Sequence, residues 1–271
     1  MSLPAPGPDR TCLITGASSG IGVDLARELA KRGHGVTLVA RREGPLRDLA
    51  DELAKAHGIR AEVATADLSD QAAREQLVGD VEKRGLAVEV LVNNAGFSTM
   101  GPVHKSDADR EIAMIRTDVE AVVHLCSAFL PGMVERGRGA VLNVASTAAF
   151  QPLPGQAGYG GSKAFVLSYS NAVGQEVRRH GVTVTTLCPG PVETGFADVM
   201  GLSEAEAASS LPSFMWVTSA AVATQAIDGL DKGRSVVIPG TPNRIGARFA
   251  HLMPRRLLLP VLASRHPSLK D

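Results

Sequence analysis

The sequence has few aromatic residues and no net charge, and these shortages argue against a nucleic-acid partner. Aromatic residues make up 4% of the 271 residues, too few for the stacking platforms that bind single strands. The 28 acidic residues balance the 28 basic ones, so the chain lacks the positive charge of a general nucleic-acid binder. We therefore expect no nucleic-acid partner.

The chain also has few cysteines and no long apolar run. Cys12, Cys126 and Cys188 show no paired or metal-ligand spacing, and two of them fall in apolar strand-like runs, where a buried reduced thiol is usual. No apolar run approaches the ~20 residues of a membrane-spanning helix. Residues 1–9 contain three prolines and lack the apolar core of a signal peptide. We expect a flexible leader over 1–9, a cytoplasmic protein and no metal site.

Short β-branched runs alternate with helical segments along most of the chain, which is typical of βαβ units and a parallel sheet. Helices are predicted at 20–32, 43–57, 107–135 with a disturbance at Pro131, and 157–180. Two more are predicted, one capped by Asp67 and Ser69 and running to Arg84, the other capped by Ser219 and ended by Gly233. The pattern predicts a doubly wound α/β fold with about seven strands, at 11–15, 36–40, 61–65, 88–92, 141–145, 182–188 and 235–238.

A phenol and an ammonium are spaced for one helical face. Tyr159 and Lys163 stand four residues apart, so in a helix their side chains leave the same side, one turn apart. A cation there would favour tyrosinate and lower the pKa of Tyr159, which could then exchange a proton with a substrate oxygen near neutral pH. Ser146 lies thirteen residues before Tyr159, where a buried strand would end. Alone, such a pair is more often two half-exposed side chains of an ordinary helix.

A glycine run between the first predicted strand and helix is suited to bind a pyrophosphate. It places free backbone N–H groups and the positive end of a helix at one point. Gly16 permits a tight turn, Gly20 permits close approach of the backbone, and Gly22 permits packing of the helix on the sheet. The run reads Thr15-Gly16-Ala17-Ser18-Ser19-Gly20-Ile21-Gly22.

Five motifs in this order resemble those of the short-chain dehydrogenase/reductase family, over residues 10–240. They are the glycine run, Asn93-Asn94-Ala95-Gly96, Ser146, Tyr159 with Lys163, and Pro189-Gly190-Pro191-Val192-Glu193-Thr194. The resemblance implies one Rossmann-like domain with strand order 3-2-1-4-5-6-7. It also implies hydride transfer between a nicotinamide and a carbonyl or secondary alcohol, with Tyr159 as the proton donor or acceptor. Lys163 would lower the pKa of Tyr159 and bind the nicotinamide ribose, and Ser146 would orient the substrate oxygen.

The end of the second predicted strand decides between NAD and NADP. An acidic residue there would bind the ribose 2′-OH of NAD, whereas cations would bind the 2′-phosphate of NADP. The chain has Arg41 and Arg42 and no acid, with Ser18 near, so we favour NADP(H) over NAD(H). The alternative is two surface arginines at a helix start. By resemblance, the other cofactor contacts are Ser19, Ile21, Asp67, Leu68, Asn94, Ala95, Gly96, Pro189, Gly190, Val192 and Thr194.

Asp118 is a departure from the family pattern, which has Asn at this place in the long helix. Its carboxylate could pair with Lys163 and so raise the pKa of Tyr159. Alternatively only its backbone carbonyl matters, or the alignment is off by one residue. We favour the backbone alternative and expect Asp118→Asn to change turnover modestly, with a loss above about a hundredfold as the contradicting result.

The segment 191–217 corresponds to the family's substrate lid. Its apolar content indicates a small apolar carbonyl or alcohol as substrate, although the same side chains could equally fill the domain's own core. They include Phe196, Met200, Leu211, Phe214, Met215 and Trp216.

The tail 241–271 differs from the rest of the chain in being basic and amphipathic. It has six Lys or Arg residues and one acid, Asp271, and Pro254 and Pro260 are expected to cut it into short pieces. Packing on the domain or a subunit contact ranks first for its role, and contact with a membrane surface ranks last. The resemblance implies a homodimer or homotetramer.

The leading hypothesis is an NADP(H)-dependent oxidoreductase. Its rivals are a catalytically weak NADP(H)-binding sensor or partner-binding protein, and an NAD-linked oxidative alcohol dehydrogenase.

Overall fold

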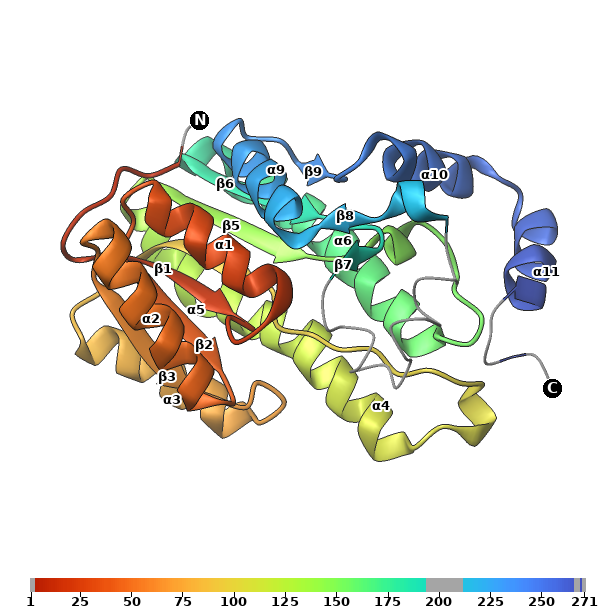
Figure 1. Ribbon diagram of the computed structural model, residues 1–271, viewed down its shortest axis with the longest axis horizontal. Helices are drawn as coiled ribbons and strands as arrows, with labels where there is room; N and C mark the ends of the chain where they lie inside the picture. Colours follow the sequence, from red (N-terminus) through yellow and green to blue (C-terminus); the bar gives the residue numbers. More distant parts are fainter. Residues whose placement is uncertain (1–2, 194–211, 266–268, 270–271) are drawn as a thin grey trace.

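The main sheet of the computed structural model has seven parallel strands, and the structure describes residues 3–193, 212–265 and 269. The strand order β3-β2-β1-β4-β5-β6-β9 confirms the predicted doubly wound fold, with β9 in seventh place (Figure 1). The bounds are β1 Arg10–Thr15, β2 Val36–Ala40, β3 Ala61–Thr65, β4 Ala87–Asn93, β5 Gly139–Val144, β6 Val182–Leu187 and β9 Val236–Val237.

The order reverses between β1 and β4, and ligands of such sheets bind beyond the carboxyl ends of the strands at that point. A second, two-stranded sheet joins β7 (Val192–Glu193) to β8 (Val217–Thr218) in parallel. The sequence did not predict this pair, which brings together the two ends of the expected lid segment.

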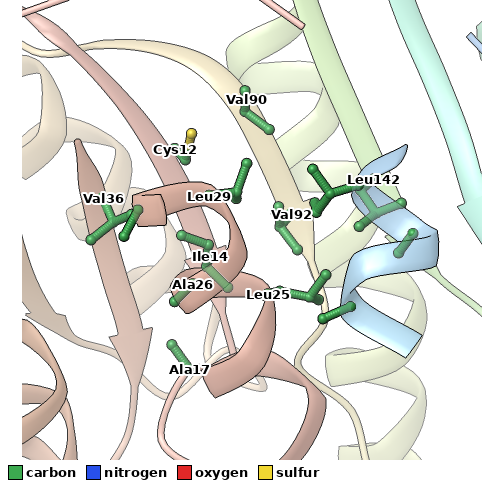
Figure 2. Packing of buried hydrophobic residues seen from close by; sticks show 14 of the residues in the cluster. Cys12, Ile14, Ala17, Leu25, Ala26, Leu29, Val36, Val90, Val92 and Leu142 are labelled. Carbon is green, nitrogen blue, oxygen red and sulfur yellow. The ribbon is translucent and has the colours of Figure 1, made fainter. Parts of the chain in front are cut away.

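Helices cover both faces of the main sheet, and each face has its own apolar core. One core lies under α1 (Gly20–Lys31), α2 (Glu43–His57) and α9 (Ser219–Asp231). Leu25, Ala26 and Leu29 of α1 lie over Ile14 and Val92 of the sheet (Figure 2). The other core lies under α3 (Gln71–Lys83), α5 (Ala121–Glu135) and α6 (Ala157–Val177). Because the central strands are buried on both sides, they read as nearly continuous apolar runs.

Two predicted helix starts are shifted because a neighbouring residue provides the cap. Asp70 caps α3 by accepting from the Ala72 N–H at 2.9 Å, while Asp67 forms a separate turn with Ser69. Thr218, not Ser219, caps α9 by accepting from the Ala221 N–H. Hydroxyl and carboxylate side chains are all good N-caps, so adjacent candidates are hard to separate from sequence.

The single helix predicted at 107–135 is three pieces in the structure. α4 (Ala108–Ile115) leads into a π-helical turn, Arg116–Glu120, which leads into α5. Pro131 lies inside α5, which continues to Glu135. The one irregularity is therefore at 116–120, the turn that carries Asp118, and π turns of this kind are frequent at functional sites.

The tail forms two helices, α10 (Thr241–Leu252) and α11 (Arg255–Arg265), which lie together at one end of the molecule, away from α1–α3 (Figure 1). Pro254 separates them as predicted, but Pro260 lies inside α11, so the prediction that it ends a helix is wrong. Across the described part of the chain, no helix is both long and apolar enough to span a bilayer.

Candidate active site

The glycine run forms the turn between β1 and α1. Gly16 and Gly20 have φ values of 67° and 57°, in the left-handed region that favours glycine. A Cβ added to Gly22 would overlap the carbonyl oxygen of Gly16, so α1 starts against the turn itself. Ser19 precedes α1 without capping it through its side chain. The first N–H groups of α1 thus lie at the carboxyl end of β1, an arrangement that suits a bound phosphate.

Thr15 and Asn94 fasten this turn to the neighbouring strand. Thr15 Oγ1 donates to Val92 O and accepts from the N–H groups of Asn94 and Ala95 at 2.9 and 3.0 Å. Asn94 Nδ2 donates to Thr15 O at 2.9 Å and to Gly16 O at 3.3 Å. In this structure the Asn94 side chain therefore holds the glycine turn in shape. Its predicted role as a cofactor contact stays a prediction.

Two arginines lie at the carboxyl end of β2, beside the glycine turn. Arg41 and Arg42 are exposed, and neither forms an ion pair within the described chain. Arg42 Nη2 donates to Ser18 Oγ at 3.4 Å, so two of the predicted phosphate contacts are neighbours. The structure thus brings Ser18 together with Arg42, one of the two cations predicted to select the cofactor.

Asp67 and Leu68 follow β3, at the same edge of the sheet as the two arginines that follow β2. Asp67 accepts from the backbone N–H and the hydroxyl of Ser69. Burial raises its pKa, but these bonds and the charge of Arg41 outweigh that effect and leave the pKa lowered. Asp67 is therefore ionised at neutral pH and interacts electrostatically with Arg41. Leu68 is buried, and its carbonyl accepts from Arg74 at 2.7 Å.

Ser146, Tyr159 and Lys163 come together where β5 ends. Ser146 starts the 3₁₀ turn Thr147–Phe150 and caps it by accepting from the Ala148 N–H. Lys163 is 5% exposed, and its Nζ lies 5.6 Å from the centroid of the Tyr159 ring. Nζ also donates to Val144 O at 3.2 Å, which fixes the ammonium to the strand that precedes Ser146. The helical face predicted for Tyr159 and Lys163 is present in α6.

The pKa of Tyr159 is raised, opposite to the direction predicted from Lys163 alone. Burial is the largest cause, and the charge of Asp118 adds to it. Lys163 and a hydrogen bond with Ser146 lower the pKa of the phenol, as predicted, but they do not outweigh burial. The sequence indicated the cation but could not indicate how far the phenol is withdrawn from water.

Asp118 pairs with Lys163 through its carboxylate. Oδ2 lies 2.9 Å from Lys163 Nζ, and Oδ1 accepts from the Phe97 N–H at 3.1 Å. Asp118 is 1% exposed, and burial is the largest cause of its raised pKa, against which Lys163 acts. Burial lowers the pKa of Lys163, but the charges of Asp118 and Tyr159 outweigh that effect and raise it. Of the three alternatives for Asp118, the structure contains the carboxylate–ammonium pair, so the side chain and not only the backbone faces Lys163.

The segment after β6 lies beside this cluster. Pro189 O accepts from the Thr147 N–H at 2.9 Å, which ties it to the turn that follows Ser146. Gly190 packs against the side chain of Asn243, and Val192 pairs with Val217. Thr194, Phe196, Met200 and Leu211 lie outside the described residues. Among the remaining lid residues, Phe214 is exposed, whereas Met215 and Trp216 are half-buried.

Sequence reasoning missed three contributors to the site. The Val144 carbonyl and the Phe97 N–H are backbone groups, which carry no signal in a side-chain pattern. Thr15 opens the glycine motif, and its buried hydroxyl links that motif to the Asn94 segment.

Comparisons with known proteins agree with this geometry. Residues 10–204 match the pattern of the family described as short chain dehydrogenase. The chain is 36% identical over 189 residues to the NADP-dependent 3-hydroxy acid dehydrogenase YdfG of Escherichia coli K12, covering 69% of this chain and 75% of that protein. A short-chain dehydrogenase from Sphingobium yanoikuyae, solved with NADPH, superposes with a TM-score of 0.80 at 32% identity over 93% of this chain and 95% of that one.

A 7beta-hydroxysteroid dehydrogenase superposes with a TM-score of 0.84 at 26% identity, covering 97% of this chain and 99% of that one. The order of the motifs, the sheet, the cluster at the end of β5 and these matches lead to one assignment. The chain belongs to the short-chain dehydrogenase family of oxidoreductases.

Proposed function

We propose that the protein is an NADP(H)-dependent oxidoreductase that interconverts an apolar ketone or aldehyde and the corresponding alcohol. The observation that carries the proposal is the meeting of Ser146, Tyr159 and Lys163 at the carboxyl end of β5, on the same edge of the sheet as the glycine turn that follows β1. A proton donor and a nucleotide-binding turn at the carboxyl ends of strands in one sheet are what carbonyl reduction by a dinucleotide requires.

The residues present fit a dinucleotide with a 2′-phosphate. Gly16, Gly20 and the start of α1 would hold the pyrophosphate. Gly22, which has no side chain, lets α1 start directly against the glycine turn. Arg41 and Arg42, with Ser18, would hold the 2′-phosphate through charge-assisted hydrogen bonds. Relatives that use or contain NADP(H) support this choice.

The remaining contacts are proposed from the family resemblance. Asp67 and Leu68 would contact the adenine, and Ala95 and Gly96 would line the cofactor. Lys163 would bind the nicotinamide ribose, and the loop from Pro189 to Thr194 would hold the nicotinamide carboxamide. Ser19, Ile21 and Asn94 complete the proposed contacts.

When bound, the nicotinamide supplies the hydride that reaches the carbonyl carbon. Ser146 orients the carbonyl oxygen through its hydroxyl, and Tyr159 donates its phenolic proton to the oxygen as charge develops there. Lys163, held by Val144 O, stabilises the tyrosinate that results. In the oxidative direction the same three residues act in reverse, with tyrosinate accepting the proton.

Asp118 is proposed to set the pH at which this exchange occurs. Its carboxylate raises the pKa of Lys163, which keeps the ammonium charged, and it also raises the pKa of Tyr159. A phenol that stays protonated favours reduction over oxidation at neutral pH. Asp118 is therefore a positioning residue that acts through Lys163.

An apolar substrate is proposed on two grounds, the side chains at the described end of the lid segment and the similarity to one solved structure. Phe214 is 67% exposed, and Met215 and Trp216 lie next to it in the chain, half-buried. The similarity to the 7beta-hydroxysteroid dehydrogenase supports an apolar substrate, because the chain superposes on nearly the whole length of that enzyme.

A homo-oligomer is proposed as well. The resemblance assigns the long helix, which is α4 to α5 in the structure, and α6 to a two-fold interface. Phe165 of α6 is 42% exposed and stacks on Tyr169 with ring centroids 5.7 Å apart. Light scattering tests the oligomeric state.

A sensor that binds NADP(H) without efficient turnover is the second candidate. The ion pair between Asp118 and Lys163 favours it, because an ammonium that is paired with a carboxylate stabilises tyrosinate less than a free one does.

Cofactor binding tests the proposal first. We expect NADPH to bind at least about tenfold more tightly than NADH, since a hydrogen bond between charged groups is commonly worth that much. Arg41→Ala combined with Arg42→Ala should remove the preference and leave NADH binding nearly unchanged. Arg47→Ala is the matched control, an exposed arginine of α2 that pairs with Glu43. A wild-type preference for NADH would overturn the role of the arginine pair.

A further inference from the structure

The tail helices carry a stripe of large apolar side chains that faces solvent. Ile245, Phe249 and Leu252 of α10 are 64%, 63% and 80% exposed. Leu257 and Val261 of α11 continue the pattern at 65% and 47%. We name these five residues the tail stripe. Scattered exposed apolar residues are ordinary, but five of them on two consecutive helices form a candidate interaction surface.

The large apolar side chains of α10 face away from the domain, whereas in an ordinary surface helix they face the core. Ile245, Phe249 and Leu252 recur at i, i+4 and i+7, so they share one face. The opposite face is the one that packs on the domain, and it consists of the smaller residues Asn243, Ala247 and Ala250, all buried. The large apolar residues that would normally fill a core therefore point outward.

Specific contacts hold α10 in this orientation. Asn243 is 2% exposed, and its Nδ2 donates to Met215 O at 2.9 Å and to Pro239 O at 3.1 Å. Its side chain also packs against Gly190, where an added Cβ would lie 2.5 Å from Oδ1. Rotating α10 to bury the tail stripe would break both hydrogen bonds and remove this packing. The outward face is thus fixed by the fold.

The charged side chains of the two tail helices have a single sign. Arg244, Arg248, Arg255 and Arg256 are exposed, and none of them is in an ion pair with a described residue. The sequence has no Asp or Glu between Thr241 and Lys270. Apolar side chains bordered by arginines without an acidic partner among the described residues match a surface that is apolar inside and negatively charged outside.

We propose that the tail stripe and its four arginines dock the protein on the surface of an anionic lipid bilayer. Leu and Phe side chains of such a helix enter the boundary between headgroups and acyl chains, while arginines pair with lipid phosphates. A second copy of the same face fits less well, because a two-fold contact would place the arginines of both copies opposite each other. The inference does not depend on the proposed catalytic function.

Vesicle co-sedimentation of the full chain tests this inference. Vesicles of phosphatidylcholine alone are compared with vesicles that contain about one third phosphatidylglycerol, at low and high salt. We expect at least about tenfold stronger binding to the anionic vesicles, weakened by salt, as electrostatic attraction to a charged surface requires. Phe249→Ser with Leu252→Ser, and separately Arg244→Gln with Arg248→Gln, should each reduce that binding about tenfold or more.

The matched control changes an exposed apolar residue away from the tail and from the proposed two-fold interface. Val103→Ser alters a side chain that is 63% exposed, and it should leave vesicle binding unchanged. Thermal melts establish that every variant is folded. Absence of binding to anionic vesicles, equal binding to neutral ones, or equal loss in the control variant would overturn the inference. So would a dimer that Phe249→Ser with Leu252→Ser converts to a monomer, because the tail stripe would then be covered by a second copy.

Discussion

Replacing Asp118 by Asn removes one buried charge and leaves the shape of the site nearly unchanged. The Asn oxygen can still accept from the Phe97 N–H, but Lys163 loses its anionic partner. Because the charge of Asp118 raises the pKa of Tyr159, its removal lowers that pKa. Lys163, no longer paired, also acts more strongly on the phenol, in the same direction.

The size of the shift follows from two distances. Lys163 Nζ lies 5.6 Å from the Tyr159 ring centroid and 2.9 Å from Asp118 Oδ2, so this oxygen and the ring centroid are at most about 8.5 Å apart. At an effective dielectric constant of ~20, a unit charge at that distance contributes about 2 kcal/mol. Removing this charge therefore lowers the pKa of Tyr159.

The pH dependence of kcat reports this change in both directions. Reduction requires the protonated phenol, so in Asp118→Asn its loss of rate should begin at a lower pH than in the wild type. Oxidation requires tyrosinate, so its rise should also begin at a lower pH, which increases oxidation at neutral pH. Turnover at each optimum should change modestly.

A control variant separates this effect from a general change of surface charge. Asp109→Asn removes an exposed carboxylate of α4 and should leave both profiles in place. Unmoved profiles in Asp118→Asn, or a shift to higher pH, would refute the electrostatic role of Asp118. A loss of turnover above about a hundredfold would mean that the carboxylate is needed for the site itself.

Two further predictions concern packing and thiol reactivity. In Gly96→Ala the new Cβ would lie 2.9 Å from Asp118 Oδ1, so we expect the protein to be destabilised by about 1–3 kcal/mol, with a lower Tm. Gly161→Ala is the control and should not lower Tm, because its new Cβ would meet open space. Burial raises the pKa of every thiol, to about 11 for Cys126 and about 12 for Cys188, so alkylation at pH 8 should be slow until the protein is unfolded. Mass spectrometry follows the alkylation, and rapid labelling of Cys12, Cys126 or Cys188 in the folded protein would contradict the burial of that thiol.

Much of the fold could be predicted because its signals are local. The six longer strands are apolar runs flanked by turn residues, and the glycine run marks the junction of β1 and α1. The shared helical face of Tyr159 and Lys163 could be predicted from their spacing, whereas the meeting of both with Ser146 was implied by the family resemblance.

The π turn at Arg116–Glu120 could not be predicted, because it changes the register of backbone hydrogen bonds without interrupting the apolar pattern. Pro260 was expected to end a helix, but α11 includes it. The predicted direction of the pKa shift of Tyr159 was wrong because the shift has no local signal in the sequence. It depends on burial by segments distant in sequence, which outweighs the neighbouring charge of Lys163.

Oxidation of NADPH with a panel of apolar ketones, by the wild type and by Tyr159→Phe, tests the proposed function most directly. Phenylalanine keeps the ring of Tyr159 and removes only its hydroxyl. We expect turnover by the wild type that falls by at least about a hundredfold in Tyr159→Phe, while NADPH binding is retained. Tight NADPH binding without turnover in the wild type, or equal turnover in both proteins, would contradict a catalytic role for the Tyr159 phenol.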